Sequence, residues 1–556
     1  MADKLHPVIK LAGREFADGK LDRRDFLRVA TLLGVSAPIA FGMAGLPSPA
    51  RAQGTPKKGG TVRLGSRVQD LKSPHTYSWV EGANAGRQTL DYLTYTGVDN
   101  ITRPNLVESW EASPDLKSWT LRLRKDVTWR KGNNRKLTAD DVVWNVKRVL
   151  DPKTGSSVVG LLKGYILDEF ETGEKDDKGV AKKSTRLWDA NAVEKVDDFT
   201  VRLNGKTPNL GIPEALFHYP FLIMDPSENG EFKVGSNGTG AFDMVELDVG
   251  KRARFAARKS GHWGGGAHLD NFEIIDLGDD AAAQVSALVS KQVDMIYQGA
   301  ITTIATIERL PNFQINMVDT AYTAVARVHS IKPFDDKRVR QALRHATDPE
   351  TVLKVAHRGL GKRGEHHHVS PAHPEYANVG YMKQDIAKAK ALLAEAGYPN
   401  GIDTEIVARP QPDWELLAVQ AMVEQWKEAG IRVKINVMPS AQYWNVWTKV
   451  PFGFTTWAHR PLGTMVHSLA YRSGGAWNES NWSNAEFDKL ITEAEGYLDV
   501  EKRRVVMAKL ERIMLDEGPI VVPLWRSLFN YTDKKIKGYK LHPSAYIEAK
   551  DMWIDA

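Results

Sequence analysis

Helix and strand patterns alternate along the whole chain, and this order limits the folds open to it more than any other feature. Residues 119–123 alternate apolar with polar side chains, as in a half-buried strand, and residues 142–150 carry an apolar stripe at helical spacing. Such alternation predicts an α/β protein. Further strands are expected at 61–64, 251–258, 271–277, 431–437 and 520–524, and helices at 280–291, 385–396, 414–429 and 500–515, the last with Val505, Val506, Leu510, Ile513 and Met514 inward.

The first 52 residues have the layout of an export signal. Arg23 and Arg24 precede a weakly apolar stretch at 29–46, and Ala50-Arg51-Ala52 fits a small-residue cleavage site. The paired arginines resemble the twin-arginine type of signal. The alternative is a membrane anchor, but the stretch is short for a span and contains glycine and proline. We therefore expect a twin-arginine signal peptide at 1–52 and a mature periplasmic protein.

Size and composition exclude several classes of protein. Residues 53–556 are too many for one hydrophobic core, so two or three substructures are expected. The chain has 75 basic and 69 acidic residues, a near balance that predicts neither a nucleic-acid partner nor a polybasic membrane patch. It has no cysteine, which excludes a cysteine nucleophile, a thiolate zinc site and an iron–sulfur cluster.

The usual catalytic motifs are missing from the sequence. It contains no G-x-S-x-G, H-E-x-x-H or P-loop, so no enzyme is predicted, although a secreted hydrolase with an unusual site is kept as an alternative. Gly238-Thr239-Gly240 lacks the third glycine of a dinucleotide site and is interpreted as a tight turn. The pairs Asp140-Asp141 and Asp279-Asp280 lie in first turns of predicted helices, where the helix dipole accounts for them.

One histidine-rich segment resembles a metal site. It consists of Glu365-His366-His367-His368, with His373 nearby. Imidazole suits nickel, copper or zinc. Adjacent histidines in a strand point to opposite faces, however, which keeps them from converging on one metal ion. A solvated loop is expected here, so no metal and no cofactor is predicted. A nickel or metallophore receptor is kept as an alternative.

Tryptophan is abundant and concentrated late in the chain. Of its 16 tryptophans, many lie between residues 414 and 482. Core packing accounts for most of them. The rest could line a binding pocket, because flat amphipathic rings give a large contact area with one polar group. Trp414, Trp477 and Tyr443 are candidates of this kind.

Several motifs, in order along the chain, resemble those of the bacterial extracellular solute-binding proteins of family 5, the dipeptide and oligopeptide type that serves ABC importers. The resemblance covers essentially the whole mature chain. The motifs are Pro104-Asn105-Leu106-Val107-Glu108-Ser109-Trp110, Leu137-Thr138-Ala139-Asp140-Asp141-Val142, Asn237-Gly238-Thr239-Gly240-Ala241-Phe242, Phe334-Asp335-Asp336-Lys337-Arg338-Val339-Arg340, Ala394-Glu395-Ala396-Gly397-Tyr398 and Ser483-Asn484-Ala485-Glu486-Phe487-Asp488.

The resemblance implies a two-lobed periplasmic-binding-protein fold of type II, in its large three-domain variety, with a hinge and an interlobe ligand cleft. Lobe one would comprise 53–315 and 516–556, with an extra domain at about 86–189. Lobe two would comprise 316–515. No catalysis is implied. The partners would be a small-molecule ligand and an ABC permease with its ATPase, and the receptor would be a monomer.

At one position the chain departs from the pattern of the peptide-binding members. These carry a tryptophan followed three residues later by an aspartate that pairs with the peptide's amino group. Here Trp457 aligns, but Arg460 stands in the place of the aspartate. A guanidinium would repel an ammonium and favour a carboxylate or phosphate, unless it pairs with a local acid.

The resulting prediction is a receptor that captures a small polar solute, peptide-like, opine-like or an oligosaccharide, by lobe closure. Trp457 and Tyr443 would supply flat walls, and Arg460 or His459 an anchor. Tyr77 and Trp79, from the loop at 70–79 of lobe one, would close over the solute. The arginine favours an acidic conjugate or an amino-blocked peptide.

Overall fold

The computed structural model describes residues 7–19, 21, 23–33, 35, 40, 43, 55–132, 135–175, 181–259 and 261–555. Within these residues the fold is two-lobed α/β, and one twelve-stranded sheet continues through both lobes. In spatial order its main path is β10 (Phe242–Asp248), β11 (Arg252–Ala257), β12 (Asn271–Ile275), β1 (Thr61–Gly65), β13 (Met295–Ile296), β20 (Leu524–Asp533), β14 (Phe313–Val328), β18 (Phe452–Trp457), β16 (Ile402–Ala408) and β17 (Ile431–Val437); β15 (Gly361–Arg363) pairs with β20, and β19 (Ile520–Val521) with β14.

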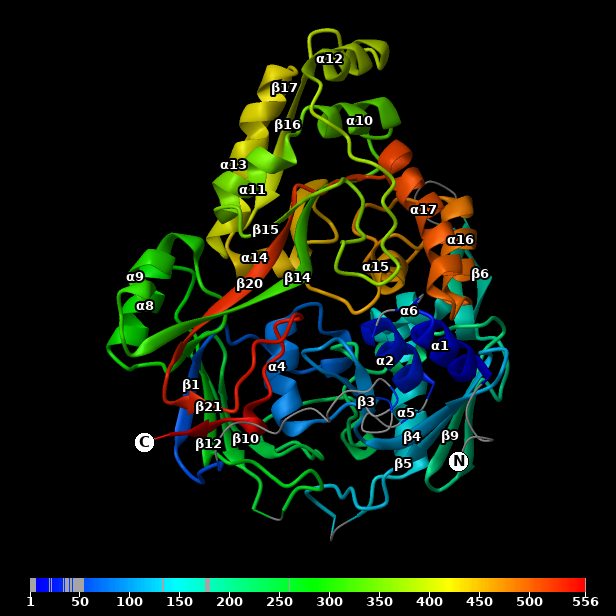
Figure 1. Cartoon of the computed structure of the whole chain (residues 1–556), viewed down its shortest axis with the longest axis vertical. Coiled ribbons are helices and arrows are strands. Elements are labelled where there is room, and N and C mark those ends of the chain that lie inside the picture. Colours follow the sequence, from blue (N-terminus) through cyan, green and yellow to red (C-terminus); the bar gives the residue numbers. More distant parts are fainter. Residues whose placement is uncertain are drawn as a thin grey trace.

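Two long antiparallel strands, β14 and β20, connect the lobes. Figure 1 shows them side by side, running from the half that carries β16 and β17 to the half that carries β1 and β12. Their pairing is interrupted between Asp319 and Tyr322, where the register shifts. β14 is partly exposed up to Asp319 and buried from Thr320 onward. The strand predicted at 520–524 corresponds to β19 and reaches only Leu524, the first residue of β20, and β14 was not predicted.

Outside the main sheet, the described residues of the first lobe form a four-stranded sheet and an exposed hairpin. The sheet order is β4 (Val107–Ala112), β5 (Ser118–Leu123), β9 (Thr200–Asn204) and β8 (Val193–Asp197). Two of these strands, β9 and β8, lie beyond residue 189, the expected end of the extra domain. The hairpin consists of β6 (Leu167–Lys175) and β7 (Ala181–Leu187). Two short strand pairs also occur: β2 (Thr94–Thr96) with β3 (Thr102–Pro104), and β21 (Ile536–Lys537) with β22 (Trp553–Ile554).

The helices cover both lobes. Those of the first lobe include α4 (Val80–Thr89), α5 (Ala139–Leu150), α6 (Val158–Ile166), α7 (Ile212–Ala215), α8 (Ala281–Val289) and α9 (Ile304–Glu308). Those of the second are α10 (Lys337–His345), α11 (Pro349–His357), α12 (Ile386–Glu395), α13 (Asp413–Glu428), α14 (Ser440–Val446), α15 (Gly463–Ala470), α16 (Ala485–Glu495) and α17 (Val500–Glu517).

The helices expected from periodicity at 280–291, 385–396, 414–429 and 500–515 are confirmed as α8, α12, α13 and α17. One detail predicted for α17, the burial of Val505, was wrong. Val506, Leu510 and Met514 are buried as expected, but Val505 is 62% exposed. It lies one position before the buried stripe, so the turn of the helix directs it to solvent.

The N-terminal segment forms two helices in the described residues, α1 (Pro7–Ala17) and α2 (Arg23–Leu32). They contact one another, and α2 packs on the first lobe, where Trp110 Nε1 donates to the Leu32 carbonyl oxygen over 2.6 Å. Arg23 and Arg24 therefore lie at the start of α2, whereas the expected cleavage site at 50–52 lies outside the described residues. In the part of the chain described here, no helix has both the length and the apolar character needed to span a membrane.

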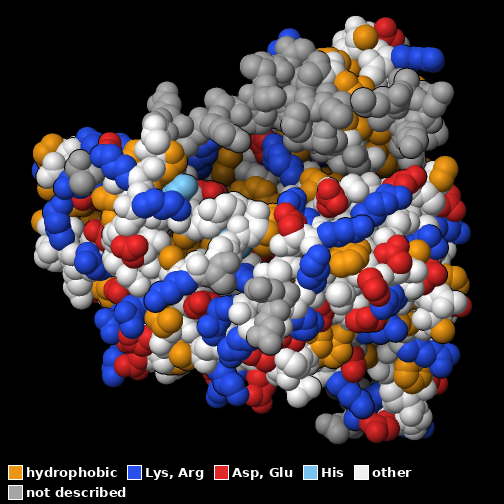
Figure 2. Space-filling view, turned by 90° about the horizontal axis from the view of Figure 1, so that it is seen from below, with side chains coloured by type: hydrophobic (Ala, Val, Ile, Leu, Met, Phe, Trp, Pro, Cys, Tyr) orange, Lys and Arg blue, Asp and Glu red, His pale blue; other side chains and the backbone are white. Residues whose placement is uncertain are grey.

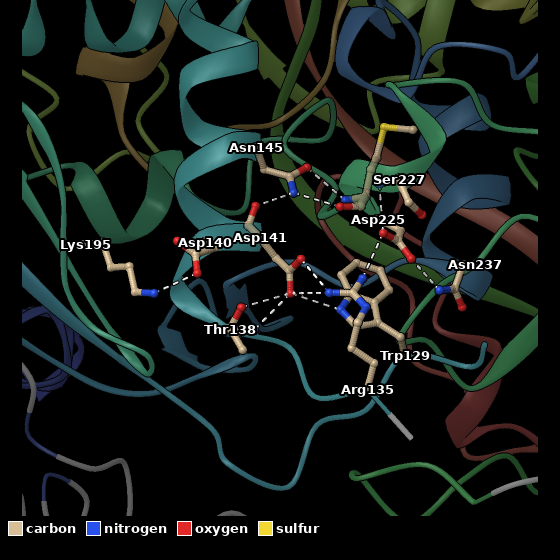
Figure 3. A network of polar contacts seen from close by, with 11 residues as sticks. Trp129, Arg135, Thr138, Asp140, Asp141, Asn145, Lys195, Asp225, Ser227 and Asn237 are labelled. Atoms are coloured by element: carbon tan, nitrogen blue, oxygen red, sulfur yellow. Dashed lines mark hydrogen bonds and ion pairs between the residues drawn. The ribbon is translucent and has the colours of Figure 1, made fainter. Parts of the chain in front are cut away.

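The paired carboxylates Asp140 and Asp141 have structural partners (Figure 3). Buried Asp141 accepts hydrogen bonds from Thr138 N over 3.0 Å and from Arg135 Nη1 over 2.8 Å, and exposed Asp140 pairs with Lys195 over 2.7 Å. Arg135 also pairs with Asp225. These contacts hold the start of α5 against its neighbours and leave no free acid–base pair there.

The glycines of Gly238-Thr239-Gly240 are explained by close packing. A Cβ at Gly238 would lie 2.0 Å from the Thr89 carbonyl oxygen, and one at Gly240 would lie 2.7 Å from that of Gln88. The backbone of this segment thus packs directly against the end of α4. The glycines are explained by this close approach of two segments and not by the predicted tight turn.

The surface seen in Figure 2 carries basic and acidic side chains interspersed with each other. No continuous patch of one sign covers the described side chains of that face. This agrees with the near balance of charges in the sequence.

Candidate functional site

A cavity between the lobes lies at the carboxyl ends of parallel strands from both lobes. In the first lobe β1 runs parallel to β12 and β13, and Gly65, Leu277 and Tyr297, at or just beyond the ends of these strands, line the cavity. In the second lobe β16 runs parallel to β18, and Arg409 and Ala458 follow their ends. The empty space is about 800 Å³, part of it open to solvent. Ligands of open α/β sheets bind at such strand ends.

Trp79 supplies the first-lobe wall, together with the start of α4. It is the N-cap residue of α4, and its indole lies across the first turn, where a Cβ on Gly82 would be 1.9 Å from the ring. Only glycine at that position leaves room for the indole. Tyr77 stacks on Trp79 with ring centroids 5.3 Å apart and donates to the Leu71 carbonyl oxygen over 2.8 Å. Tyr77 is buried beneath Trp79 and does not line the cavity.

The second-lobe wall is built around Arg409. Its Nε lies 3.1 Å from Glu415 Oε2, its Nη2 donates to Thr456 Oγ1 over 2.8 Å, and its guanidinium lies 4.6 Å from the Trp444 ring centroid. Burial is the largest influence on the pKa of Arg409, but the Glu415 charge reverses it and raises that pKa. Arg409 is therefore a charged part of the wall, and Glu415 both balances its charge and holds it in place.

Trp457 points away from this cavity. Along β18 successive side chains alternate, so Thr456 and Ala458 face the cavity while Trp457 faces the other side. There its ring contacts Trp447 and Trp477, and its Nε1 donates to Glu479 Oε1 over 2.8 Å. Glu479 in turn pairs with Arg327 of β14 over 2.7 Å, so Trp457 connects an aromatic cluster to a hinge strand.

The loop after β18 inserts two buried side chains between the lobes. Arg460 is 2% exposed, donates from Nη1 to the Ala458 and His459 carbonyl oxygens, and lies 4.9 Å from the Tyr219 ring centroid. His459 Nδ1 accepts from Ala321 N of β14, and its Nε2 lies 2.9 Å from Asn100 Oδ1 of the first lobe. Burial holds the pKa of His459 well below its usual value, so the ring is neutral.

The remaining predicted contacts, Tyr443, Trp414 and Trp477, are buried around the cavity. The Tyr443 hydroxyl lies 2.6 Å from Thr455 Oγ1, and Trp414 packs against Phe454 and Arg526. Trp477 meets Tyr219 of the first lobe, with centroids 5.4 Å apart. Of the eight predicted residues, Trp79 lines the cavity and seven lie in the shell around it, so their contact with a ligand stays a prediction.

Sequence reasoning missed most of the residues that line the cavity. These include Glu81, Tyr219, Tyr297, Tyr322, Arg409 and Trp444. The sequence offered one indication of these residues: Tyr297 and Arg409 each come directly after a short apolar strand. The sequence does not give the spatial order of the strands, so it does not show which strand ends meet at the same edge of the sheet.

The histidine segment is buried, so the expectation of a solvated loop was wrong. His366, His367, His368 and His373 are each at most 3% exposed. They diverge: His368 Nδ1 lies 2.6 Å from the Tyr471 hydroxyl, whereas His373 Nε2 lies 3.2 Å from the Arg460 carbonyl oxygen. Among the residues with described positions, no group of three or more histidines and carboxylates could hold a metal ion.

Two hinged lobes with an aromatic-lined cavity at the strand ends between them define a binding protein of the periplasmic type. The sequence pattern of the bacterial extracellular solute-binding proteins, family 5 Middle, matches residues 102–478, and the chain belongs to this family. Its curated relatives include heme-binding protein A of Haemophilus influenzae, 27% identical over 80% of this chain and 82% of the relative. They also include the dipeptide-binding protein of Escherichia coli, 26% identical over 79% and 84%.

Solved structures share the fold at low sequence identity. The DppA protein of Helicobacter pylori, in complex with the peptide STSA, has a TM-score of 0.77 and 20% identity, covering 90% of this chain and 99% of that one. AgaA of A. tumefacien R10, in complex with agropinic acid, has a TM-score of 0.77 and 21% identity, covering 89% and 99%. The fold expected from the sequence is therefore confirmed.

Proposed function

We propose that this chain is the periplasmic receptor of an ABC importer and captures a small polar solute by closure of its lobes. The observation that carries the proposal is the cavity at the strand ends, which Trp79 enters from the first lobe and Trp444 from the second. The named relatives bind dipeptides or heme, and the related structures hold a peptide or agropinic acid. The receptor performs no covalent chemistry and acts as a monomer.

Closure is a shift between two populations, so the solute has to bind the closed form better than the open one. Reversing a ratio of 1:99 takes about 5.5 kcal/mol of differential affinity. The walls that both lobes contribute support this, because a solute between them gains contacts on closure. The closed form would then be recognised by the permease, whose ATPase drives uptake.

The lobe borders belong to the proposal. We take lobe one as 53–315 with 516–556, its extra domain as about 86–189, and lobe two as 316–515. β14 and β20 carry the chain across these borders and would form the hinge. The shift in their register between Asp319 and Tyr322 is a position where bending disrupts few backbone hydrogen bonds.

Small-angle scattering tests the proposal. The radius of gyration should fall when a solute that copurifies with the protein, identified by native mass spectrometry, is added back to emptied protein. Curves that coincide with and without that solute would contradict closure. Products of the solute in the same mixture would contradict the absence of catalysis.

Arg460 is proposed to attract an acidic group of the solute from behind the Tyr219 ring, against which it lies. Supporting this, its hydrogen bonds within the described residues go to carbonyl oxygens and not to a carboxylate, so its charge is not neutralised locally. Replacing it in Arg460→Asp should lower affinity for a carboxylate-bearing solute at least tenfold by calorimetry. Unchanged affinity would remove Arg460 from the site.

Export by the twin-arginine pathway is proposed from Arg23 and Arg24 and the Ala50-Arg51-Ala52 site. The double variant Arg23→Lys with Arg24→Lys should leave the uncleaved precursor in the cytoplasm. N-terminal sequencing of the wild-type periplasmic protein should begin near Gln53. Export of the double variant at the wild-type level would contradict the pathway.

A further inference from the structure

Glu81 differs from the other charged side chains that line the interlobe cavity. Arg67 pairs with Asp279, and Arg409 pairs with Glu415. Glu81 is half-buried in the first turn of α4 and has no ion pair or hydrogen bond among the described residues. Its charge is therefore available to a group that enters the cavity.

The surroundings of Glu81 are suited to a donor. The Tyr297 hydroxyl and Gln298 Oε1 line the same cavity and make no hydrogen bond of normal geometry with a described residue. Tyr297 is only 6% exposed, so its hydroxyl is buried, with the Gln298 side chain as a polar neighbour. Burial raises the pKa of Tyr297, and the Glu81 charge raises it further.

Aromatic rings complete this end of the cavity. Trp79 and Tyr297 line the cavity together with Glu81. The faces of such rings attract cations, and sites that combine rings with a carboxylate recognise ammonium groups. The Glu81 charge also raises the pKa of Tyr322, after the larger effects of burial and Arg526, so it acts on both tyrosines.

Two other rings of the cavity lie against cations. Arg460 lies 4.9 Å from the Tyr219 ring centroid and Arg526 lies 5.0 Å from that of Tyr322. The two tyrosines line the cavity and the two arginines do not, so each cation lies behind a ring. Neither arginine forms an ion pair with a carboxylate of the described residues. A cationic group would be repelled from the rings of Tyr219 and Tyr322 and attracted to Glu81.

We propose that Glu81 is the specificity-determining residue for a cationic nitrogen of the solute, such as the ammonium group of a zwitterionic amino compound. The ammonium would lie on the first-lobe side, between the Glu81 carboxylate and the rings of Trp79 and Tyr297. The anionic or neutral end would face the rings of Tyr219 and Tyr322, which lie against Arg460 and Arg526. The proposal rests on the proposed function and adds the chemical class and orientation of the solute.

A purely structural role for Glu81 has a different signature. An acid in the first turn of a helix interacts favourably with the helix dipole, and its loss lowers helix stability slightly. In that case Glu81→Gln would lower the melting temperature and leave solute preference unchanged. The conservative variant Glu81→Asp, which keeps the charge, should restore part of the preference only if the carboxylate contacts the solute.

The experiment uses matched solutes on the full mature protein. Calorimetry at pH 7 compares alanyl-phenylalanine with N-acetyl-alanyl-phenylalanine, and glucosamine with N-acetylglucosamine. In the wild type at least one free amine should bind at least tenfold more tightly than its acetylated twin. Glu81→Gln should abolish that difference. Glu108→Gln, an exposed acid on β4, should keep it.

The outcomes separate the two proposals. If acetylated solutes bind as tightly as the amines and still contract the protein in scattering, receptor function stands and the role of Glu81 is overturned. A Glu81→Gln protein that keeps the amine preference overturns it as well. If no solute of either kind binds and none copurifies, both proposals fall.

Discussion

Arg409 and Glu415 form a buried ion pair in the second-lobe wall of the interlobe cavity, with Arg409 Nε 3.1 Å from Glu415 Oε2. Both residues are at most 3% exposed. Glu415 lies in the first turn of α13, where the helix dipole also favours a carboxylate. The pair keeps a cation at the cavity without leaving it uncompensated, and it positions Thr456 and Trp444 around the guanidinium.

Breaking this pair should be costly. Glu415→Gln leaves the Arg409 charge buried without a counter-ion, so we expect the free energy of unfolding to fall by about 3–5 kcal/mol in urea titrations. The control is Asp403→Asn, which breaks the exposed pair with Arg432. Solvent screens that pair, so its loss should change stability little. Equal effects of the two variants would contradict the assignment.

Glu511 of α17 should make the protein less stable as the pH rises. Neither of its side-chain oxygens has a hydrogen-bond partner among the described residues, and burial raises its pKa from 4.5 to about 9. Between these values the native state keeps a proton that the unfolded state releases, so the free energy of unfolding falls with rising pH. Glu511→Gln, which resembles the protonated form, should be more stable than the wild type at pH 8 by more than about 1 kcal/mol. Parallel urea stability profiles at pH 5 and pH 8 would refute this.

His366 should have the opposite effect in acid. It is fully buried beside Arg344, His367 and His345, and burial lowers its pKa from 6.5 to about 3. Below pH 6.5 the unfolded state binds a proton that the native state excludes, so stability falls as the pH decreases toward 3. His366 has a φ of 62°, which asparagine tolerates, so His366→Asn is the suitable variant. Its stability should depend less on pH between 6.5 and 4 than that of the wild type, by up to about 1.4 kcal/mol per pH unit. An unchanged slope would exclude His366 as a contributor.

Solute binding should change tryptophan fluorescence through two residues. Trp79 and Trp444 line the cavity from opposite lobes, so closure alters the surroundings of both. The double variant Trp79→Phe with Trp444→Phe should lose most of the emission change caused by the copurified solute. Trp119→Phe, which is fully buried in the four-stranded sheet of the first lobe, should keep it. A change that survives in the double variant would place the solute elsewhere.

Local pattern was sufficient for most elements of secondary structure. The apolar stripe of 500–515 corresponds to α17, and the alternation of 431–437 corresponds to β17, because periodicity of 3.6 or 2 depends only on neighbouring residues. It was less reliable where an element passes between environments. β14 is half exposed and half buried, so it has no single alternation, and it was not predicted.

The sequence by itself determined the α/β class, the order of helices and strands and, through ordered motifs, the family. Tertiary structure alone decided which side chains meet. Glu81, Tyr297 and Arg409 are hundreds of residues apart and become neighbours because the carboxyl ends of parallel strands in two lobes face one cavity. The direction of Trp457 likewise depends on which face of β18 the first lobe covers, and no neighbouring residue encodes that choice.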